Sequence, residues 1–234
     1  MSAVTYFIAG TDTGVGKTRV TAALLAAARE QGLAVAGMKP VAAGAEWVDG
    51  RLVSQDALRI AAASGQETPY EDLNPYCLSD AVSPHIAANR DKISIDIDLI
   101  VTISQRLQAG RKLLLIEGAG GWYAPISARD SMADVARALA SRVILVVGLK
   151  LGCLNHARLT REAIERSGCA LAGWVASQID PEFALLNENL ATLARLLDSP
   201  PLATLPHARS GAHDAAQVRA AVPRLLAAGN AHNT

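Results

Sequence analysis

Short apolar runs alternate with longer amphipathic stretches along most of the chain. The first run, Thr5 to Ala9, leads into a glycine-rich turn and then into an alanine- and leucine-rich stretch from Lys17 to Gln31 with helical spacing. This order predicts a strand, a loop and a helix. Further strands are expected at the apolar runs Ala34 to Met38, Leu113 to Ile116, Val143 to Val147, Leu171 to Ala176 and, with a weaker pattern, Leu202 to Leu205.

Several of these runs are apolar at every position instead of alternating. Continuous apolar strands are typical of a parallel sheet that is covered by helices on both faces. The pattern therefore predicts an α/β protein with three layers, in which a central, mostly parallel sheet lies between helices.

Two long segments interrupt the alternation, Pro40 to Gln55 and Pro69 to Pro84. Both contain turn-forming residues and few sustained apolar periods, so we expect loops there. Loops of this length in a compact protein often carry function. With no internal repeat or linker-like stretch, we expect one domain over residues 1–228 and a disordered polar tail over residues 229–234.

Composition narrows the classes of function. The 22 basic and 22 acidic residues balance, which gives no support to a nucleic-acid binder and favours a small-molecule substrate. The three cysteines are widely spaced and form no Cys-x-x-Cys pair, which argues against a disulfide framework and a zinc site. The sequence shows no leader-like start and no apolar run long enough to span a membrane, so we expect no membrane association. We expect a cytoplasmic location instead.

A phosphate-binding loop is predicted between Gly10 and Thr18. It follows the first strand and opens the first helix, which is the context that such a loop requires. Its glycines let backbone N–H groups turn toward phosphates, Lys17 is placed to bridge the terminal phosphates, and the Thr18 hydroxyl is placed to bind magnesium. The spacing departs from the common form because the leading glycine, Gly10, lies one residue early. The alternative, a chance glycine-rich turn, does not explain this context.

Acidic and basic residues at the ends of other predicted strands extend this site. Glu117 ends the strand at Leu113 to Ile116, where an acid in a parallel sheet faces bound ligands. Lys39 ends the second strand, where a fixed ammonium would stabilise charge during phosphoryl transfer. Asp56 begins a helical segment, and at this stage either a helix-dipole partner or a ligand fits it. The segment Gly148 to Asn155 offers backbone donors for an anion, although a simple helix cap explains the same pattern.

Taken together, these residues resemble the dethiobiotin synthetase family from Tyr6 to about Pro206. The motifs that carry the resemblance are Gly10-Thr-Asp-Thr with Val15-Gly-Lys-Thr18, Gly37-Met-Lys-Pro-Val41, Asn74-Pro-Tyr76, Ser83-Pro-His85, Glu117-Gly-Ala-Gly-Gly-Trp122, Val146-Val-Gly-Leu-Lys-Leu-Gly-Cys-Leu-Asn-His156 and Gly173-Trp-Val175. The resemblance implies a P-loop NTPase-like fold and a ligase that uses Mg²⁺ and ATP. Its substrates would be diaminopelargonic acid, CO₂ and ATP, its intermediates a carbamate and a carbamic-phosphoric anhydride, and its products dethiobiotin, ADP and phosphate.

The resemblance also implies a role for individual residues. Lys17 and Lys39 would be catalytic, and Thr18, Asp56 and Glu117 would bind the metal. The nucleotide would be bound by residues in four parts of the chain: Thr13, Gly14, Val15, Gly16, Lys17, Thr18 and Arg19; Asp56; Glu117, Gly118, Ala119 and Gly120; and Ser177, Pro206, His207 and Ala208. The substrate would be bound by Thr11, Lys39 and Ala43 and, across the interface of a homodimer, by Gly152, Cys153, Leu154 and Asn155 of the other copy.

Three positions depart from the family pattern. Ala43 stands where the family often places a serine, Gly14 where some members have an acid, and Ser177 where an asparagine commonly reads the adenine. Because one hydroxyl cannot replace both hydrogen bonds of an amide, Ser177 predicts looser discrimination between ATP and other triphosphates.

Two other functions use the same motifs. Partition and division-site ATPases share the fold, but they typically carry an additional lysine early in the loop, where this chain has Thr11, Asp12 and Thr13. A different amide- or urea-forming ligase of the same superfamily is the nearer alternative. Its amidating members usually add a glutaminase domain, for which this chain has neither the length nor the motif.

Overall fold

The computed structural model describes residues 3–65, 67–139, 142–207 and 214–230. Six parallel strands form the central sheet in the order β10-β9-β8-β1-β7-β2. They span Val4–Gly10 (β1), Val35–Met38 (β2), Leu113–Glu117 (β7), Arg142–Leu149 (β8), Ala170–Gln178 (β9) and Ala203–Leu205 (β10). Each strand expected from the apolar runs is present, and the parallel sheet of the predicted fold class is confirmed.

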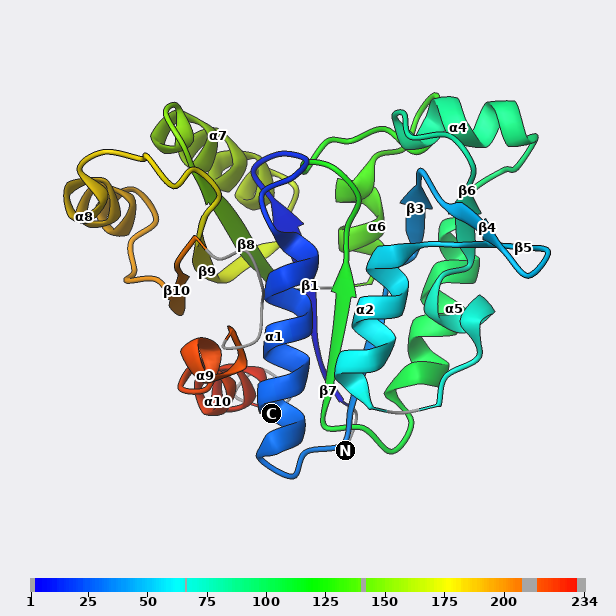
Figure 1. The fold of residues 1–234 in the computed structure, drawn as a ribbon, viewed down its shortest axis with the longest axis horizontal. Helices are drawn as coiled ribbons and strands as arrows, with labels where there is room; N and C mark the ends of the chain where they lie inside the picture. Colours follow the sequence, from blue (N-terminus) through cyan, green and yellow to red (C-terminus); the bar gives the residue numbers. More distant parts are fainter. Residues whose placement is uncertain (1–2, 66, 140–141, 208–213, 231–234) are drawn as a thin grey trace.

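Helices cover both faces of this sheet (Figure 1). One face packs against α1 (Lys17–Glu30), α2 (Gln55–Ser64), α9 (Asp214–Val218) and α10 (Ala221–Asn230). The other packs against α5 (Ile97–Gln108), α6 (Met132–Ala138), α7 (Cys153–Arg166) and α8 (Leu186–Leu196), while α4 (Pro84–Asp91) packs against the short strands described below. Along β1 the side chains alternate between these layers, because successive residues of a strand point to opposite faces. Tyr6 and Ile8 join the first core and Phe7 and Ala9 the second.

The two segments expected as loops contain short elements. They hold β3 (Val41–Ala43), β4 (Glu46–Val48), β5 (Arg51–Val53), α3 (Tyr70–Leu73) and β6 (Tyr76–Leu78). Strand β3 pairs in parallel with β6, and β4 pairs with β5 as a hairpin. The expectation of plain loops was therefore wrong, because strands of three residues are too short to give a periodic signal and are stabilised by each other instead of by the central sheet. The β3–β6 pair brings the two segments side by side.

Among the described residues, no helix is both long enough and apolar enough to cross a membrane.

Candidate nucleotide and metal site

A cavity of about 760 Å³ lies at the carboxyl ends of the central strands. Ligands collect at this edge of an open parallel sheet. The walls come from the phosphate loop, the end of β2, strand β3, the start of α2, the segment before α4 and the turn after β7. The residues that line it are Thr13, Gly14, Gly16, Lys17, Thr18, Arg19, Lys39, Ala42, Ala43, Asp56, Arg59, Ala81, Val82, Ser83, Pro84, Glu117, Ala119, Gly120, Gly121, Ala124 and Pro125.

The phosphate loop depends on glycine at the start of α1. Gly16 is the N-cap of this helix and has φ 93°, a left-handed conformation that side chains disfavour. A Cβ on Gly16 would also lie 2.7 Å from Oγ of Ser177. The loop therefore turns its backbone toward the cavity, where the helix N-terminus adds a partial positive charge.

Lys17 places a second positive charge beside this loop. Its Nζ donates to the backbone oxygen of Asp12 at 2.9 Å and to that of Gly120 at 2.6 Å. Burial, together with the nearby charge of Lys39, lowers the pKa of Lys17 to about 8. The two carbonyls hold this ammonium between the loop and the turn after β7.

Lys39 and Glu117 form the most buried charged pair of the site. Nζ of Lys39 lies 2.6 Å from Oε1 of Glu117 and 3.2 Å from Oδ2 of Asp56. Burial lowers the pKa of Lys39, but the charges of Glu117 and Asp56 outweigh this effect, so the pKa is raised. Burial likewise raises the pKa of Asp56, but the charge of Lys39 and the side-chain hydrogen bonds from Thr18 and Lys39 together outweigh this effect, so this pKa is lowered. Both groups are therefore charged at neutral pH.

Glu117 also contacts the phosphate loop, because Oγ1 of Thr18 donates to Oε1 of Glu117 at 2.7 Å. The other oxygen, Oε2 of Glu117, is buried without a hydrogen-bond partner in the described part of the chain. A hydroxyl and two carboxylates are hard oxygen ligands of the kind Mg²⁺ prefers, and Mg²⁺ commonly takes only one or two carboxylates and completes its shell with phosphates and water. The described residues contain no cluster of three or more His, Cys, Asp or Glu side chains that would hold a metal without such help. Thr18, Asp56 and Glu117 thus fit Mg²⁺ beside a bound triphosphate.

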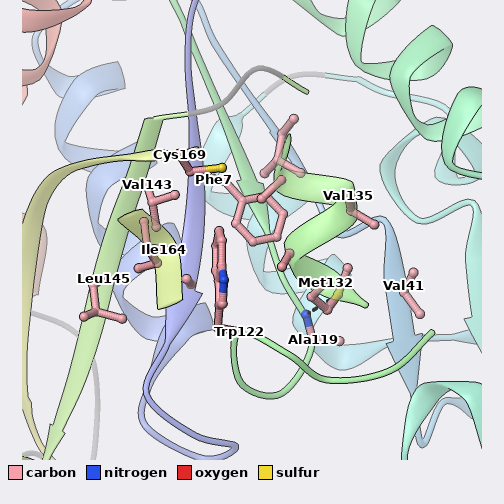
Figure 2. Packing of buried hydrophobic residues seen from close by; sticks show 14 of the residues in the cluster. Phe7, Val41, Ala119, Trp122, Met132, Val135, Val143, Leu145, Ile164 and Cys169 are labelled. Atoms are coloured by element: carbon pink, nitrogen blue, oxygen red, sulfur yellow. Dashed lines mark hydrogen bonds between the residues drawn. The ribbon is translucent and has the colours of Figure 1, made fainter. Parts of the chain in front are cut away.

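The turn after β7 packs against the hydrophobic core (Figure 2). Trp122 packs edge-on against Phe7, with ring centroids 6.3 Å apart, and the N–H of Ala119 points to the sulfur of Met132 at 3.1 Å. These contacts anchor the glycine-rich turn that presents Ala119 and Gly120 to the cavity.

Most residues expected at the nucleotide site meet at this cavity, and several do not. The cavity takes in the loop residues from Thr13 to Arg19 except Val15, which is fully buried, together with Lys39, Ala43, Asp56, Glu117, Ala119 and Gly120. The expected residues that do not line it are Thr11, Val15, Gly118, Gly152, Cys153, Leu154, Asn155, Ser177, Pro206 and His207. Ala208 lies outside the described residues.

Thr11 does not line the cavity, whereas Thr13 and Thr18 of the same loop do. Ser177 is 1% exposed, and its Oγ is buried without a hydrogen-bond partner among the described residues, close to Gly16. Its contact with a nucleobase stays a prediction.

Sequence reasoning missed part of the wall opposite the phosphate loop. Ala81, Val82 and Pro84 line the cavity together with Ser83, whose Oγ lies 3.0 Å from Nδ1 of His85. The motif Ser83-Pro-His85 was visible in the sequence, but nothing in it revealed that β3 pairs with β6 and so carries this segment to the cavity. Arg59 was missed as well, because a single charge on a helix carries no signal of its own.

A comparison with family models matches residues 4–212 to a family described as an AAA domain. Curated relatives match over nearly the whole chain. An ATP-dependent dethiobiotin synthetase of Aromatoleum aromaticum is 48% identical and covers 93% of this chain and 96% of its own length. One of Cellvibrio japonicus is 42% identical and covers 97% and 99% respectively.

Solved structures support the fold class. The MinC:MinD cell division protein complex of Aquifex aeolicus matches with a TM-score of 0.62 at 15% identity and covers 96% of each chain. MinD of Pyrococcus horikoshii complexed with Mg-ADP matches with a TM-score of 0.54 at 17% identity, covering 98% of this chain and 96% of its own. At such identities the likeness shows the fold alone. The curated relatives show more: the chain belongs to the family of ATP-dependent dethiobiotin synthetases and is an ATP-dependent ligase.

Proposed function

We propose that, as a member of this family, the chain makes dethiobiotin from diaminopelargonic acid, CO₂ and ATP in a Mg²⁺-dependent reaction. One substrate amine would capture CO₂ as a carbamate. A carbamate oxygen would take the terminal phosphoryl group of ATP, and the neighbouring amine would displace phosphate to close the cyclic urea. The observation that carries this proposal is the buried pair of Lys39 and Glu117 beside Lys17 in the cavity, in a chain whose curated relatives are named ATP-dependent dethiobiotin synthetases.

The phosphate loop and the turn after β7 would hold the triphosphate. Backbone N–H groups from Thr13 to Thr18 would surround the phosphates, and Lys17 would exchange its two carbonyl partners for phosphate oxygens. Thr18, Asp56 and Glu117 would hold Mg²⁺, whose charge would favour the developing negative charge on the phosphates.

Lys39 would stabilise the negative charge of the reacting groups. Its ammonium is held by Glu117 and Asp56 at the edge of the cavity, so it needs little reorganisation when charge develops on the carbamate and on the transferred phosphoryl group. Thr13 would be the loop hydroxyl nearest the substrate. Ala43 also lines the cavity and, because alanine has no hydroxyl, contributes only apolar contact at this position.

The base of the nucleotide would lie at the carboxyl ends of β9 and β10. Pro206 and His207 are exposed there, and the backbone N–H of His207 donates to Oε1 of Gln178 at 3.2 Å. Because the hydroxyl of Ser177 is buried, we expect weaker discrimination between ATP and other triphosphates than an amide at this position would give. A clear preference for ATP over GTP in direct competition would contradict this point.

A homodimer would complete the substrate site. Gly152, with φ 93°, caps the N-terminus of α7, a helix of 14 residues, and Leu151 beside it is 94% exposed. These residues do not line the cavity of their own chain. In a symmetric dimer the segment Gly152–Asn155 of the second copy would bind the substrate carboxylate through backbone N–H groups. Within each copy, residues 1–228 would act as a single domain.

The experiment that tests this function is incorporation of radiolabelled bicarbonate into acid-stable product. The purified protein is supplied with Mg²⁺, ATP and diaminopelargonic acid, and each component is omitted in turn. We expect label only in the complete mixture, together with equimolar release of phosphate. Hydrolysis of ATP without label would leave the nucleotide site standing and refute the substrate.

A further inference from the structure

Arg19 is the third residue of α1, directly after the phosphate-binding residues Lys17 and Thr18, and it lines the cavity. Its guanidinium makes two parallel bonds with Asp214, the first residue of α9. Nε donates to Oδ2 at 2.6 Å and Nη2 donates to Oδ1 at 2.6 Å. The carboxylate of Asp214 is almost fully buried, since the residue is 6% exposed.

This fork fixes the arginine in one orientation. Two parallel bonds to a carboxylate define the plane of a guanidinium as well as its position, which a lysine cannot do. Within the described part of the chain, the remaining nitrogen, Nη1, has no hydrogen-bond partner. A buried acid thus holds a cavity-lining arginine and leaves one donor edge of it available.

The place of this guanidinium in the site follows from the arrangement of the helices. Helix α1 lies between α2 and α9 (Figure 1). Asp56 of α2, together with Lys39 and Glu117, marks one side of α1 as the place of the metal and the terminal phosphate. Arg19 turns to the other side, toward α9 and the end of β10. A nucleotide bound with its terminal phosphate at Lys39 and its base at the ends of β9 and β10, as proposed above, would carry its α-phosphate to the Arg19 side of α1.

We propose that Arg19, held in place by Asp214, binds the α-phosphate of the nucleotide through Nη1 and that Asp214 is a positioning residue. This inference rests on the proposed nucleotide site. Arg19 lies away from the bond that breaks, so it strengthens the binding of ATP and of ADP alike and contributes little to the chemical step. Arg19 and Asp214 set nucleotide affinity, while Lys39 sets the rate.

The test measures affinity for ADP with the full chain, by calorimetry, in Arg19→Met, Arg19→Lys and Asp214→Asn. The matched control is Arg161→Met, which breaks a surface pair with Asp198 whose N–O distance is also 2.6 Å. We expect the first three variants to lose affinity by about tenfold or more for ADP and ATP alike, with a smaller fall in kcat than in kcat/KM for ATP. Arg161→Met should bind as the parent chain does.

A second measurement addresses the α-phosphate directly. The two diastereomers of ADP with sulfur on the α-phosphorus should bind the parent chain with different affinities, and Arg19→Met should reduce this difference. If Arg19→Met does not fold, Arg19→Lys and Asp214→Asn answer the same question. Unchanged ADP affinity in folded variants, or an unchanged diastereomer preference, would overturn this inference alone. A parent chain that binds no ADP would overturn it together with the proposed function.

Discussion

Nζ of Lys39 lies 2.6 Å from Oε1 of Glu117, and the two residues are buried at 4% and 0% exposure. They come from the ends of two adjacent parallel strands, β2 and β7. Sequence places them 78 positions apart. Because each residue is the principal ionic partner of the other, a change at either one should affect both the stability of the site and its chemistry.

Removing the charge of Lys39 should abolish most of the activity. We expect Lys39→Met to lower kcat by at least about a hundredfold, since a preorganised charge is lost where negative charge develops. It should also destabilise the chain by about 3–5 kcal/mol, because Glu117 stays buried without its partner. Turnover assays and urea unfolding measure the two effects.

The double variant Lys39→Met/Glu117→Gln separates the effect on turnover from the effect on stability. It removes both charges and should recover much of the stability while turnover stays low. Near-normal turnover in Lys39→Met would remove this lysine from the catalytic residues.

The hydroxyl of Thr18 should be required for the response to Mg²⁺. Thr18→Val keeps the shape of the side chain but loses the oxygen that lies 2.7 Å from Glu117. We expect the Mg²⁺ concentration for half-maximal activity to rise by about tenfold or more. Thr18→Ser, which keeps the oxygen, is the control and should respond almost as the parent chain does. An unchanged Mg²⁺ titration in Thr18→Val would argue against Thr18 as a ligand.

Nucleotide affinity should fall as the pH rises through the pKa of Lys17, which is about 8 in the free protein. Bound phosphates would raise this pKa, so above about pH 8 binding takes up a proton and the affinity for ADP falls by up to about tenfold per pH unit. Calorimetry with ADP and a metal chelator, in buffers of different ionisation enthalpy, measures both the affinity and the proton uptake. Lys17→Arg cannot titrate in this range and should lose the pH dependence. Equal affinity at about pH 7 and about pH 9.5 in the parent chain would refute the prediction.

Glycine should be required at position 16 for two separable reasons. Gly16→Ala places a Cβ in a left-handed conformation and 2.7 Å from Oγ of Ser177. We expect loss of nucleotide binding and a lower melting temperature. Gly16→Ala/Ser177→Ala removes the clashing oxygen and should recover part of the melting temperature, but not the part that the backbone conformation costs. If both variants have the same melting temperature as the parent chain, the close approach of Ser177 to Gly16 is not a constraint.

Mixing two inactive variants should restore activity if the site spans a dimer. One variant is Lys39→Met, and the other replaces Asn155 with a bulky residue, Asn155→Trp, on the segment proposed to hold the substrate of the other copy. Random exchange makes half of the dimers mixed, each with one intact site, so about a quarter of the parent activity should return. Mixtures that stay inactive after demonstrated subunit exchange would argue against a shared site.

The sequence by itself determined the central sheet and the phosphate loop. Continuous apolar runs such as Leu113–Ile116 are too short for helices and so predict buried strands. The loop from Gly10 to Thr18 is recognisable because its glycines, lysine and threonine act locally, within one turn between a strand and a helix. Strand-end positions also identified Lys39 and Glu117, since the carboxyl ends of parallel strands share one edge.

Tertiary structure decided what depends on contacts between distant segments. The pairing of β3 with β6 carries Ser83 to the cavity, and the bond between Arg19 and Asp214 joins residues 195 positions apart. Neither leaves a local pattern, because a three-residue strand has no period and a lone charge on a helix resembles any solvated residue. The physical reason is the range of the interaction: periodicity and turn chemistry are written in neighbouring residues, whereas the partner of a buried charge is chosen only when the chain has folded.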